Sequence, residues 1–376
     1  MVVRTTKIDF KVQSMTVTMK DIARIAGVSQ QAVSAALSTH KTMKVSETMR
    51  KKIQHIATTL NYMPNNAAQC LKGKATRTIG IFGVPYVSVM TQALMLDISL
   101  ELSKENYNLL SCYGEGAEAE FQAVKELIGK GIDGLIITGF SNPLCCFKAS
   151  PVPYVFCPPC KLSGFDVTVD HAAGTALALD ELLKMGYSRP GYLVSCQSEL
   201  NSNSPNYEKY QGFLGALKKH RMKPITDSLI ALKDYDGDVE RIIRKVKAMK
   251  LDILFCSNDY LASRLLNPLV ANGIRIPEDM ALIGYDGLSL CDITTVPLAT
   301  IIQPNTAFAK NIVEILLERI RNKQFNDVPK GIALKPYFYP SGSCGALTGM
   351  LKKIKMIDTF STLELNWKIS GQGQSE

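Results

Sequence analysis

The chain has no long hydrophobic run and no apolar segment near its start. None of its 376 residues lie in a stretch that approaches the ~18–20 apolar residues a membrane-spanning helix needs. The first 14 residues contain Arg4, Lys7, Asp9 and Lys11 without the apolar core of a secretory signal. We therefore expect no membrane partner and a cytoplasmic location, with residues 1–15 as a disordered leader and Met15 as an alternative start.

The residues and motifs of common enzymes are also scarce. There are 4 histidines, no Gly-x-Gly-x-x-Gly motif follows the first candidate strand, and a phosphate-binding P-loop is missing. His171 beside Asp170 is a candidate catalytic pair. The sequence otherwise argues against an enzyme and predicts no cofactor.

Cysteine is plentiful, but its pattern does not indicate disulfides. The 10 cysteines are scattered and lie mostly in strand-like runs, where reduced thiols behave as small apolar side chains. Cys157 and Cys160 have the Cys-x-x-Cys spacing of a redox or zinc site, and the nearest further pair is Cys145 with Cys146. The alternative is a loop stiffened by the two intervening prolines, which we favour, so we predict no metal.

Acidic side chains are nearly missing from the first 77 residues. This segment holds 13 Lys and Arg against 3 Asp and Glu, whereas the rest of the chain holds 30 against 31. The net charge of +9 is therefore concentrated in one region. Such a localised positive charge is typical of a surface that binds nucleic acid.

Two short helices joined by a tight turn are predicted over Thr18–Leu37. Thr18 and Ser29 are N-cap residues, and Gly27 ends the first helix because glycine adopts the left-handed conformation at low cost. One apolar stripe is formed by Ile22, Ala23, Ile25 and Ala26, and another by Val33, Ala36 and Leu37. This arrangement leaves Gln30, Gln31, Ser34 and Ala35 on the outer face. The alternative is a generic helical hairpin.

A third helix is predicted to follow Ser46. Met49, Ile53, Ile56, Ala57 and Leu60 form its apolar stripe, and Arg50, Lys51 and Lys52 lie in its first half. Three small helices with a basic exterior can place the second helix in the major groove of DNA.

From Thr78 onward, apolar runs alternate with amphipathic helical patterns, which predicts parallel sheets covered on both faces. The strand candidates are Ile79–Val84, Asn108–Cys112, Leu135–Thr138, Pro153–Phe156, Gly191–Cys196, Ser228–Leu232, Ile253–Cys256 and Ala281–Tyr285. The helix candidates include Met90–Glu105, Ala119–Lys130, Gly174–Met185 and Tyr207–His220. Roughly ten strands over ~270 residues suit two doubly wound lobes better than one.

Ligands of such sheets bind beyond the carboxyl ends of the strands. Asp259 follows the candidate strand Ile253–Cys256, and Asp286 follows Ala281–Tyr285. Either carboxylate could accept hydrogen bonds from a ligand or instead cap the next helix.

The chain resembles the lactose/galactose repressor family of bacterial transcription regulators over most of residues 16–348. The similarity in the amino-terminal part lies in Thr18–Ala23, Ala26–Ser29, Ala32–Ser34, Leu60–Asn65 and Ala68–Gly73. In the large domain it lies in Gly131–Ile137, Val169–Gly174, Ser257–Asp259, Ile283–Asp286, Pro297–Pro304 and Gly342–Cys344. The resemblance implies a helix-turn-helix DNA-binding domain (16–64) and a hinge (65–77). It also implies a two-lobed, periplasmic-binding-protein-like domain (78–348) that binds the effector and forms the dimer. It also makes His171 a loop position.

The resemblance implies a repressor that binds double-stranded operator DNA as a homodimer and is associated with the nucleoid. The DNA-binding positions would be Thr18, Met19, Lys20, Ser29, Gln30, Gln31, Ser34, Ala35, Ser38, Val45, Ser46, Tyr62, Asn65, Ala68, Gln69, Leu71 and Lys72. In the family the leucine at position 71 enters the minor groove and kinks the site. Many members have arginine where this chain has Ala35, so we expect that base step not to be G·C-specific.

The resemblance also implies a sugar-like effector bound between the lobes, near Tyr86, Met90, Lys209, Asp259 and Asp286. Lys209 stands where the family pattern Arg-x-x-Gly-Phe has arginine, which removes a planar donor; the alternative is a solvated lysine. Aromatic residues common near Met90 are missing, although Tyr86 could replace them.

The tail, residues 349–376, lies beyond the resemblance. Its alternating segment Leu363–Ile369 predicts an edge strand or disorder and lacks the leucine heptads of a tetramerising helix. A solute-binding protein of the same fold is the second hypothesis, but the basic amino-terminal segment argues against it.

Overall fold

The structure is a computed structural model that describes residues 17–37, 45–62, 75–83, 89–114, 116–139, 150–232, 238–323 and 328–346. It contains two compact units, Met1–Thr76 and Arg77–Glu376. The predicted leader, residues 65–74 of the hinge and the tail lie outside the described residues.

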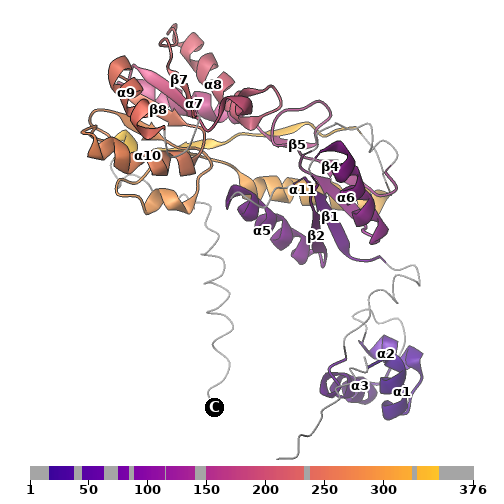
Figure 1. Ribbon diagram of the computed structural model, residues 1–376. Helices are drawn as coiled ribbons and strands as arrows, with labels where there is room; N and C mark the ends of the chain where they lie inside the picture. Colours follow the sequence, from indigo (N-terminus) through magenta and orange to yellow (C-terminus); the bar gives the residue numbers. More distant parts are fainter. Residues whose placement is uncertain are drawn as a thin grey trace, which may run out of the picture. The chain divides into compact units, whose positions relative to one another are not determined.

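The first unit contains the helices α1 (Met19–Ala26), α2 (Gln30–Leu37) and α3 (Glu47–Thr59), shown in Figure 1. Their ends follow the predicted local signals. The carboxylate of Asp21 accepts hydrogen bonds from the backbone N–H of Thr18 at 3.1 Å and from its hydroxyl at 2.7 Å. Gly27 has φ 72° and ends α1, and the Ser29 hydroxyl accepts from the N–H of Ala32 at 3.2 Å.

The core of this unit is small and apolar. Ile22, Val33 and Ile53 are fully buried, one from each helix. Ile25, which we expected in the apolar stripe of α1, is instead 50% exposed. The eight residues of α1 bury one narrow face made of Ile22, Ala23 and Ala26, and Ile25 lies outside that face.

The second unit has two lobes, each built on a parallel sheet (Figure 1). The first sheet has the order β2-β1-β3-β4, with strands Asn108–Cys112, Thr78–Phe82, Gly134–Ile137 and Tyr154–Phe156. The second has the order β7-β6-β8-β9, with strands Leu229–Ala231, Pro190–Val194, Ile253–Cys256 and Ala281–Ile283. The same order therefore occurs twice, which confirms the predicted pair of doubly wound lobes.

Helices accompany both sheets. The first lobe has α5 (Val89–Lys104) and α6 (Ala117–Gly129). The second has α7 (His171–Lys184), α8 (Pro205–Lys219), α9 (Val239–Met249) and α10 (Asp259–Ala271). In the described part of the chain, no helix combines the length and apolarity required to cross a bilayer.

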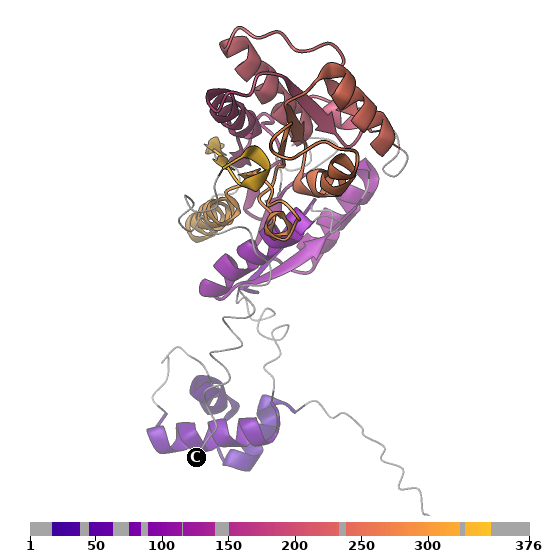
Figure 2. The same ribbon diagram turned by 90° about the vertical axis from the view of Figure 1, so that its left-hand side faces the viewer.

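Three crossovers join the lobes within the described residues. The chain passes from β5 (Val167–Val169) to α7, from β10 (Thr300–Ile302) to α11 (Asn305–Asn322), and from β11 (Ile332–Leu334) to β12 (Tyr337–Tyr339). Helix α11 packs in the core of the first lobe beside α5, although some 200 residues separate them, as the colours of Figures 1 and 2 show. The segments from β10 to β12 therefore connect the second lobe to the core of the first.

The sequence located eight of these strands to within two residues and did not predict β5, β10, β11 and β12. The four missed strands are short segments at the crossovers between the lobes, outside the strand–helix alternation on which the prediction was based. Their partners are distant: β5 pairs with β11, and β10 pairs antiparallel with β12.

Candidate DNA-reading surface and ligand cavity

Helix α2 exposes part of the face expected to read DNA. Gln30, Gln31 and Ser34 are exposed. Ala35 is only 6% exposed, contrary to our expectation that it lies on the outer face. The guanidinium of Arg50 in α3 donates to the carbonyl oxygens of Ala35 and Ala36 at 3.2 and 2.9 Å, so α3 lies against this end of α2. The Ala35 methyl is therefore not presented for contact with a base.

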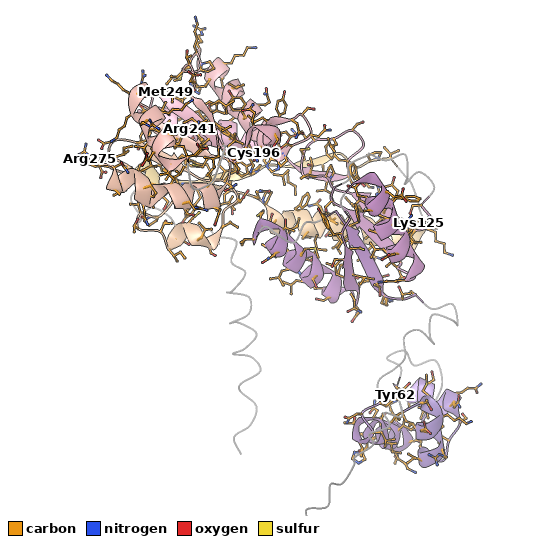
Figure 3. The ribbon with its side chains drawn as sticks, in the orientation of Figure 1. Tyr62, Lys125, Cys196, Arg241, Met249 and Arg275 are labelled. Atoms are coloured by element: carbon orange, nitrogen blue, oxygen red, sulfur yellow. The ribbon has the colours of Figure 1, made fainter. Side chains whose placement is uncertain are left out.

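The remaining expected DNA contacts divide into three groups. Thr18, Lys20, Ser29 and Ser46 are exposed next to helix amino termini. Met19, Val45 and Tyr62 pack against the core of the first unit, and Figure 3 shows Tyr62 within this unit. The residues that lie outside the described part of the chain are Ser38, Asn65, Ala68, Gln69, Leu71 and Lys72.

A cavity of about 1060 Å³ lies between the two lobes of the second unit. Its described lining comes from both lobes and from the crossovers. The polar lining residues include Thr91, Thr138, His171, Asn206, Lys209, Ser257, Asn258, Asp286, Gln303 and Asn305. Most of them follow the carboxyl ends of strands or begin helices, as expected for a ligand site of this architecture.

Lys209 lines the cavity and is only 4% exposed, so it is not a solvated lysine. Its ammonium donates to the carbonyl oxygen of Ser257 at 2.8 Å and lies 3.5 Å from the carboxylate of Asp286. It also lies 3.9 Å from the ring centroid of Tyr285. These contacts balance the buried charge. They also mean that Lys209 does not extend freely towards a ligand.

Asp286 lines the cavity in a backbone conformation that is unusual for aspartate, with φ 115°. The side-chain amide of Gln303 donates to its carboxylate at 2.7 Å. Burial raises the pKa of Asp286, while Lys209 and the amide of Gln303 act in the opposite direction. The carboxylate is thus fixed at the cavity surface as a hydrogen-bond acceptor.

Asp259 was predicted as a ligand residue, but it is fully buried and does not belong to the cavity lining. Its carboxylate accepts from the N–H groups of Gly287 and Leu288, both at 2.7 Å, and from the Thr300 hydroxyl at 2.5 Å. Burial and the negative charge of Asp286 raise its pKa to about 7. Asp259 therefore holds the turn that follows Asp286, while Asn258 caps α10.

His171 lines the cavity as the first residue of α7, and not at the loop position that the resemblance implies. The carboxylate of Asp170, its neighbour in the candidate catalytic pair, caps this helix and accepts from the N–H of Ala173 at 3.1 Å. The Nε2 of His171 lies 2.9 Å from the carbonyl oxygen of Pro159 in the first lobe, and its Nδ1 lies 2.9 Å from the hydroxyl of Tyr285 in the second. A carbonyl only accepts, so we assign the proton to Nε2, and Nδ1 accepts from Tyr285. Burial, followed by the charge of Lys209, lowers the pKa of His171 to about 3. The neutral imidazole thus connects the two lobes through one hydrogen bond to Pro159 and one to Tyr285.

The Cys157–Cys160 segment is a junction between lobes. Both cysteines are buried free thiols, and no cluster of metal-ligating side chains occurs among the described residues. Burial raises the pKa of the Cys160 thiol to about 11 and that of Cys157 well above its ordinary value. The N–H of the next residue, Lys161, donates to Glu208 of α8 at 2.6 Å, and its ammonium pairs with Asp170 at 2.8 Å. The stiffened-loop interpretation fits these contacts.

Two further predicted ligand residues can be compared with the cavity. Met90 lines it, and its sulfur lies 3.4 Å from the amide nitrogen of Asn305. Tyr86 lies outside the described residues. The sequence reasoning missed Ser257, a lining residue whose buried hydroxyl has no hydrogen-bond partner among the described residues. Its place after the strand Ile253–Cys256 was the available signal.

Two family models match the chain. Residues 18–65 match the bacterial regulatory proteins of the lacI family, and residues 179–336 match a periplasmic binding protein-like domain. The HTH-type transcriptional repressor PurR of Vibrio cholerae is 30% identical over 319 residues, covering 82% of this chain and 92% of that protein. The ribose operon repressor of Haemophilus influenzae is 28% identical over 316 residues, covering 82% and 93%.

Solved structures share the fold. The lac repressor dimer bound to operator and the anti-inducer ONPF has a TM-score of 0.74 and 22% identity, covering 88% of this chain and 99% of that chain. A LacI family transcriptional regulator from Enterococcus faecium with bound ribose has a TM-score of 0.58 and 25% identity, covering 71% and 98%.

Proposed function

This chain belongs to the lacI family of bacterial regulatory proteins, and we propose which of its residues read DNA and which bind the ligand of a ligand-controlled repressor. The protein is a DNA-binding transcriptional regulator with a small-molecule site in its two-lobed unit, and the relatives that it matches are repressors, not enzymes. The observation that carries this function is the combination of a basic helix-turn-helix unit with a polar cavity between two lobes.

We assign DNA reading to the exposed face of α2, with Gln30, Gln31 and Ser34 at base edges. The exposed residues at helix amino termini, Thr18, Lys20, Ser29 and Ser46, would contact phosphates. Leu71 would enter the minor groove and Lys72 would meet a phosphate, as in the resembled family. Two such units in a homodimer would bind the halves of a pseudo-palindromic operator.

We assign ligand binding to the inter-lobe cavity, where Asp286 accepts hydrogen bonds and Met90 contributes apolar surface. The hydroxyl of Ser257, which is buried at this cavity without a hydrogen-bond partner among the described residues, is a further candidate for contact with the ligand. The carboxylate, amides and hydroxyls among the lining residues suit a hydroxyl-rich, sugar-like molecule. Ligand in the cavity would change the angle between the lobes, and operator and ligand would then alter each other's affinity by one common factor.

Selection of operator sites from a random DNA library by the full-length protein tests this function. We expect a two-fold-symmetric site whose base step near Ala35 shows no preference for G·C, because alanine offers no hydrogen bond there. Failure to enrich any site at low salt, with or without candidate sugars, would overturn the assignment of α2 as a DNA-reading helix.

A thermal-shift screen of sugars, sugar phosphates and nucleobases tests ligand binding in the cavity separately. We place the protein in the cytoplasm, on the nucleoid, because operator DNA lies there.

A further inference from the structure

The third helix of the DNA-binding unit directs part of its positive charge inward. Arg50, Lys51 and Lys52 were expected to form a basic exterior. Arg50 instead donates from one guanidinium nitrogen to the carbonyl oxygens of Ala35 and Ala36, at 3.2 and 2.9 Å. The ammonium of Lys52 lies 3.3 Å from the carbonyl oxygen of Ala26. Two consecutive helices are thus held at their carboxyl ends by cations from α3.

These contacts satisfy a physical need of short helices. The last carbonyl groups of a helix have no partner within it, and the helix dipole makes that end negative. Helix α2 has eight residues and no basic residue in its own last turn. A helix of this length is not stable alone and depends on what it packs against.

The side chains of α2 provide little packing to fix its orientation. Three of its eight residues are alanines, and only Val33 among its larger apolar side chains is fully buried. Small side chains permit close approach but allow one helix to shift against another. The bifurcated contact of the half-buried Arg50 therefore supplies the directional constraint on this helix.

We propose that Arg50 is a positioning residue for DNA reading. By holding the carboxyl end of α2, it sets the angle at which Gln30, Gln31 and Ser34 meet the bases. Lys52 holds α1 in the same way, and exposed Lys51 is left to meet phosphates. The proposal rests on the assignment of α2 as the reading helix.

The test compares Arg50→Met with the matched control Lys51→Met, since each removes one charge from the same helix. Affinities of the full-length variants are measured for the operator that the unsubstituted protein selects and for a shuffled duplex, over a range of salt concentrations. We expect Arg50→Met to lower the ratio of specific to non-specific affinity by about tenfold, with an unchanged salt slope. Lys51→Met should weaken both duplexes equally and reduce the salt slope by about 1.

Arg50→Lys, which can still donate to a carbonyl, should recover most of the specificity. If Arg50→Met lost the same affinity for both duplexes and showed a reduced salt slope, Arg50 would be a phosphate contact and the proposal would be overturned. An unchanged ratio of specific to non-specific affinity would overturn it as well. If Arg50→Met does not fold, Arg50→Gln carries the same expectation, because its uncharged amide nitrogen ends two bonds short of the guanidinium nitrogen that reaches the carbonyl oxygens of Ala35 and Ala36. If the unsubstituted protein selects no operator, the reading function itself fails before any variant is compared.

Discussion

The imidazole of His171 is neutral because of how it is buried. Its partners are a carbonyl oxygen of Pro159 and the hydroxyl of Tyr285, and the ammonium of Lys209 lies on the ring of Tyr285. The pKa is lowered from 6.5 to about 3 in the folded protein. Between these values the unfolded chain binds a proton that the folded chain does not, so stability falls as the pH falls below about 6.5.

We predict that His171→Gln removes this part of the pH dependence. Glutamine offers one donor and one acceptor, as the neutral imidazole does, and it does not titrate. The free energy of unfolding of the original protein should fall by up to about 1.4 kcal/mol per pH unit more steeply than that of the variant between pH 6 and pH 4. Urea unfolding at several pH values measures both slopes. Parallel slopes would show that His171 is not buried as a neutral ring.

At the scale of elements, a buried ion pair joins α11 to the sheet of the first lobe. The guanidinium of Arg319 binds both carboxylate oxygens of Asp166, at 2.6 and 2.8 Å. The same carboxylate accepts from the N–H of Phe156 at 2.9 Å and of Lys330 at 3.1 Å. One acidic side chain thus connects α11, the end of β4 and the segment before β11, which come from distant parts of the chain.

We predict that Arg319→Met destabilises the large unit by about 3–5 kcal/mol, because it leaves the carboxylate of Asp166 buried without its cation. Arg321→Met is the matched control on the same helix, since Arg321 is exposed and lies 3.8 Å from exposed Glu105. Its effect should stay within about 0.5 kcal/mol. Chemical denaturation gives both values, and similar losses for the two variants would contradict a special role for Arg319.

At the scale of the whole molecule, the chain has separate units for DNA and for ligand, with the boundary between Thr76 and Arg77. Residues 65–74, most of the segment predicted as a hinge between the two units, lie outside the described part of the chain. The resemblance assigns Leu71 to the minor groove of the operator.

We predict that Leu71→Ala weakens operator binding by more than about tenfold while ligand affinity and the thermal midpoint stay unchanged. The alanine would remove the apolar side chain that, by the resemblance, enters the minor groove and contacts only kinked DNA. Titrations with operator and with shuffled DNA measure the effect, and calorimetry with a ligand from the thermal screen provides the control. An equal loss on both duplexes would argue against insertion at a base step.

The sequence by itself determined the elements of the DNA-binding unit and the two-lobed class. The helix caps depend only on residues a few positions apart in sequence, so they can be predicted without tertiary information. These caps are Thr18, Gly27, Ser29 and Ser46. The alternation of strands and helices is equally local, and it placed Asp286 at the cavity because parallel strands present their carboxyl ends on one edge.

Only the tertiary structure decided what the polar residues at these ends contact. Asp259 and Asp286 both follow strands, yet one binds the Gly287 and Leu288 amides and the other lines the cavity. Lys209 is buried against Ser257, and Ala35 lies under α3, through partners that are 48 and 15 residues away in sequence. A side chain's burial and its hydrogen bonds depend on such distant neighbours, and no local pattern of residues specifies them.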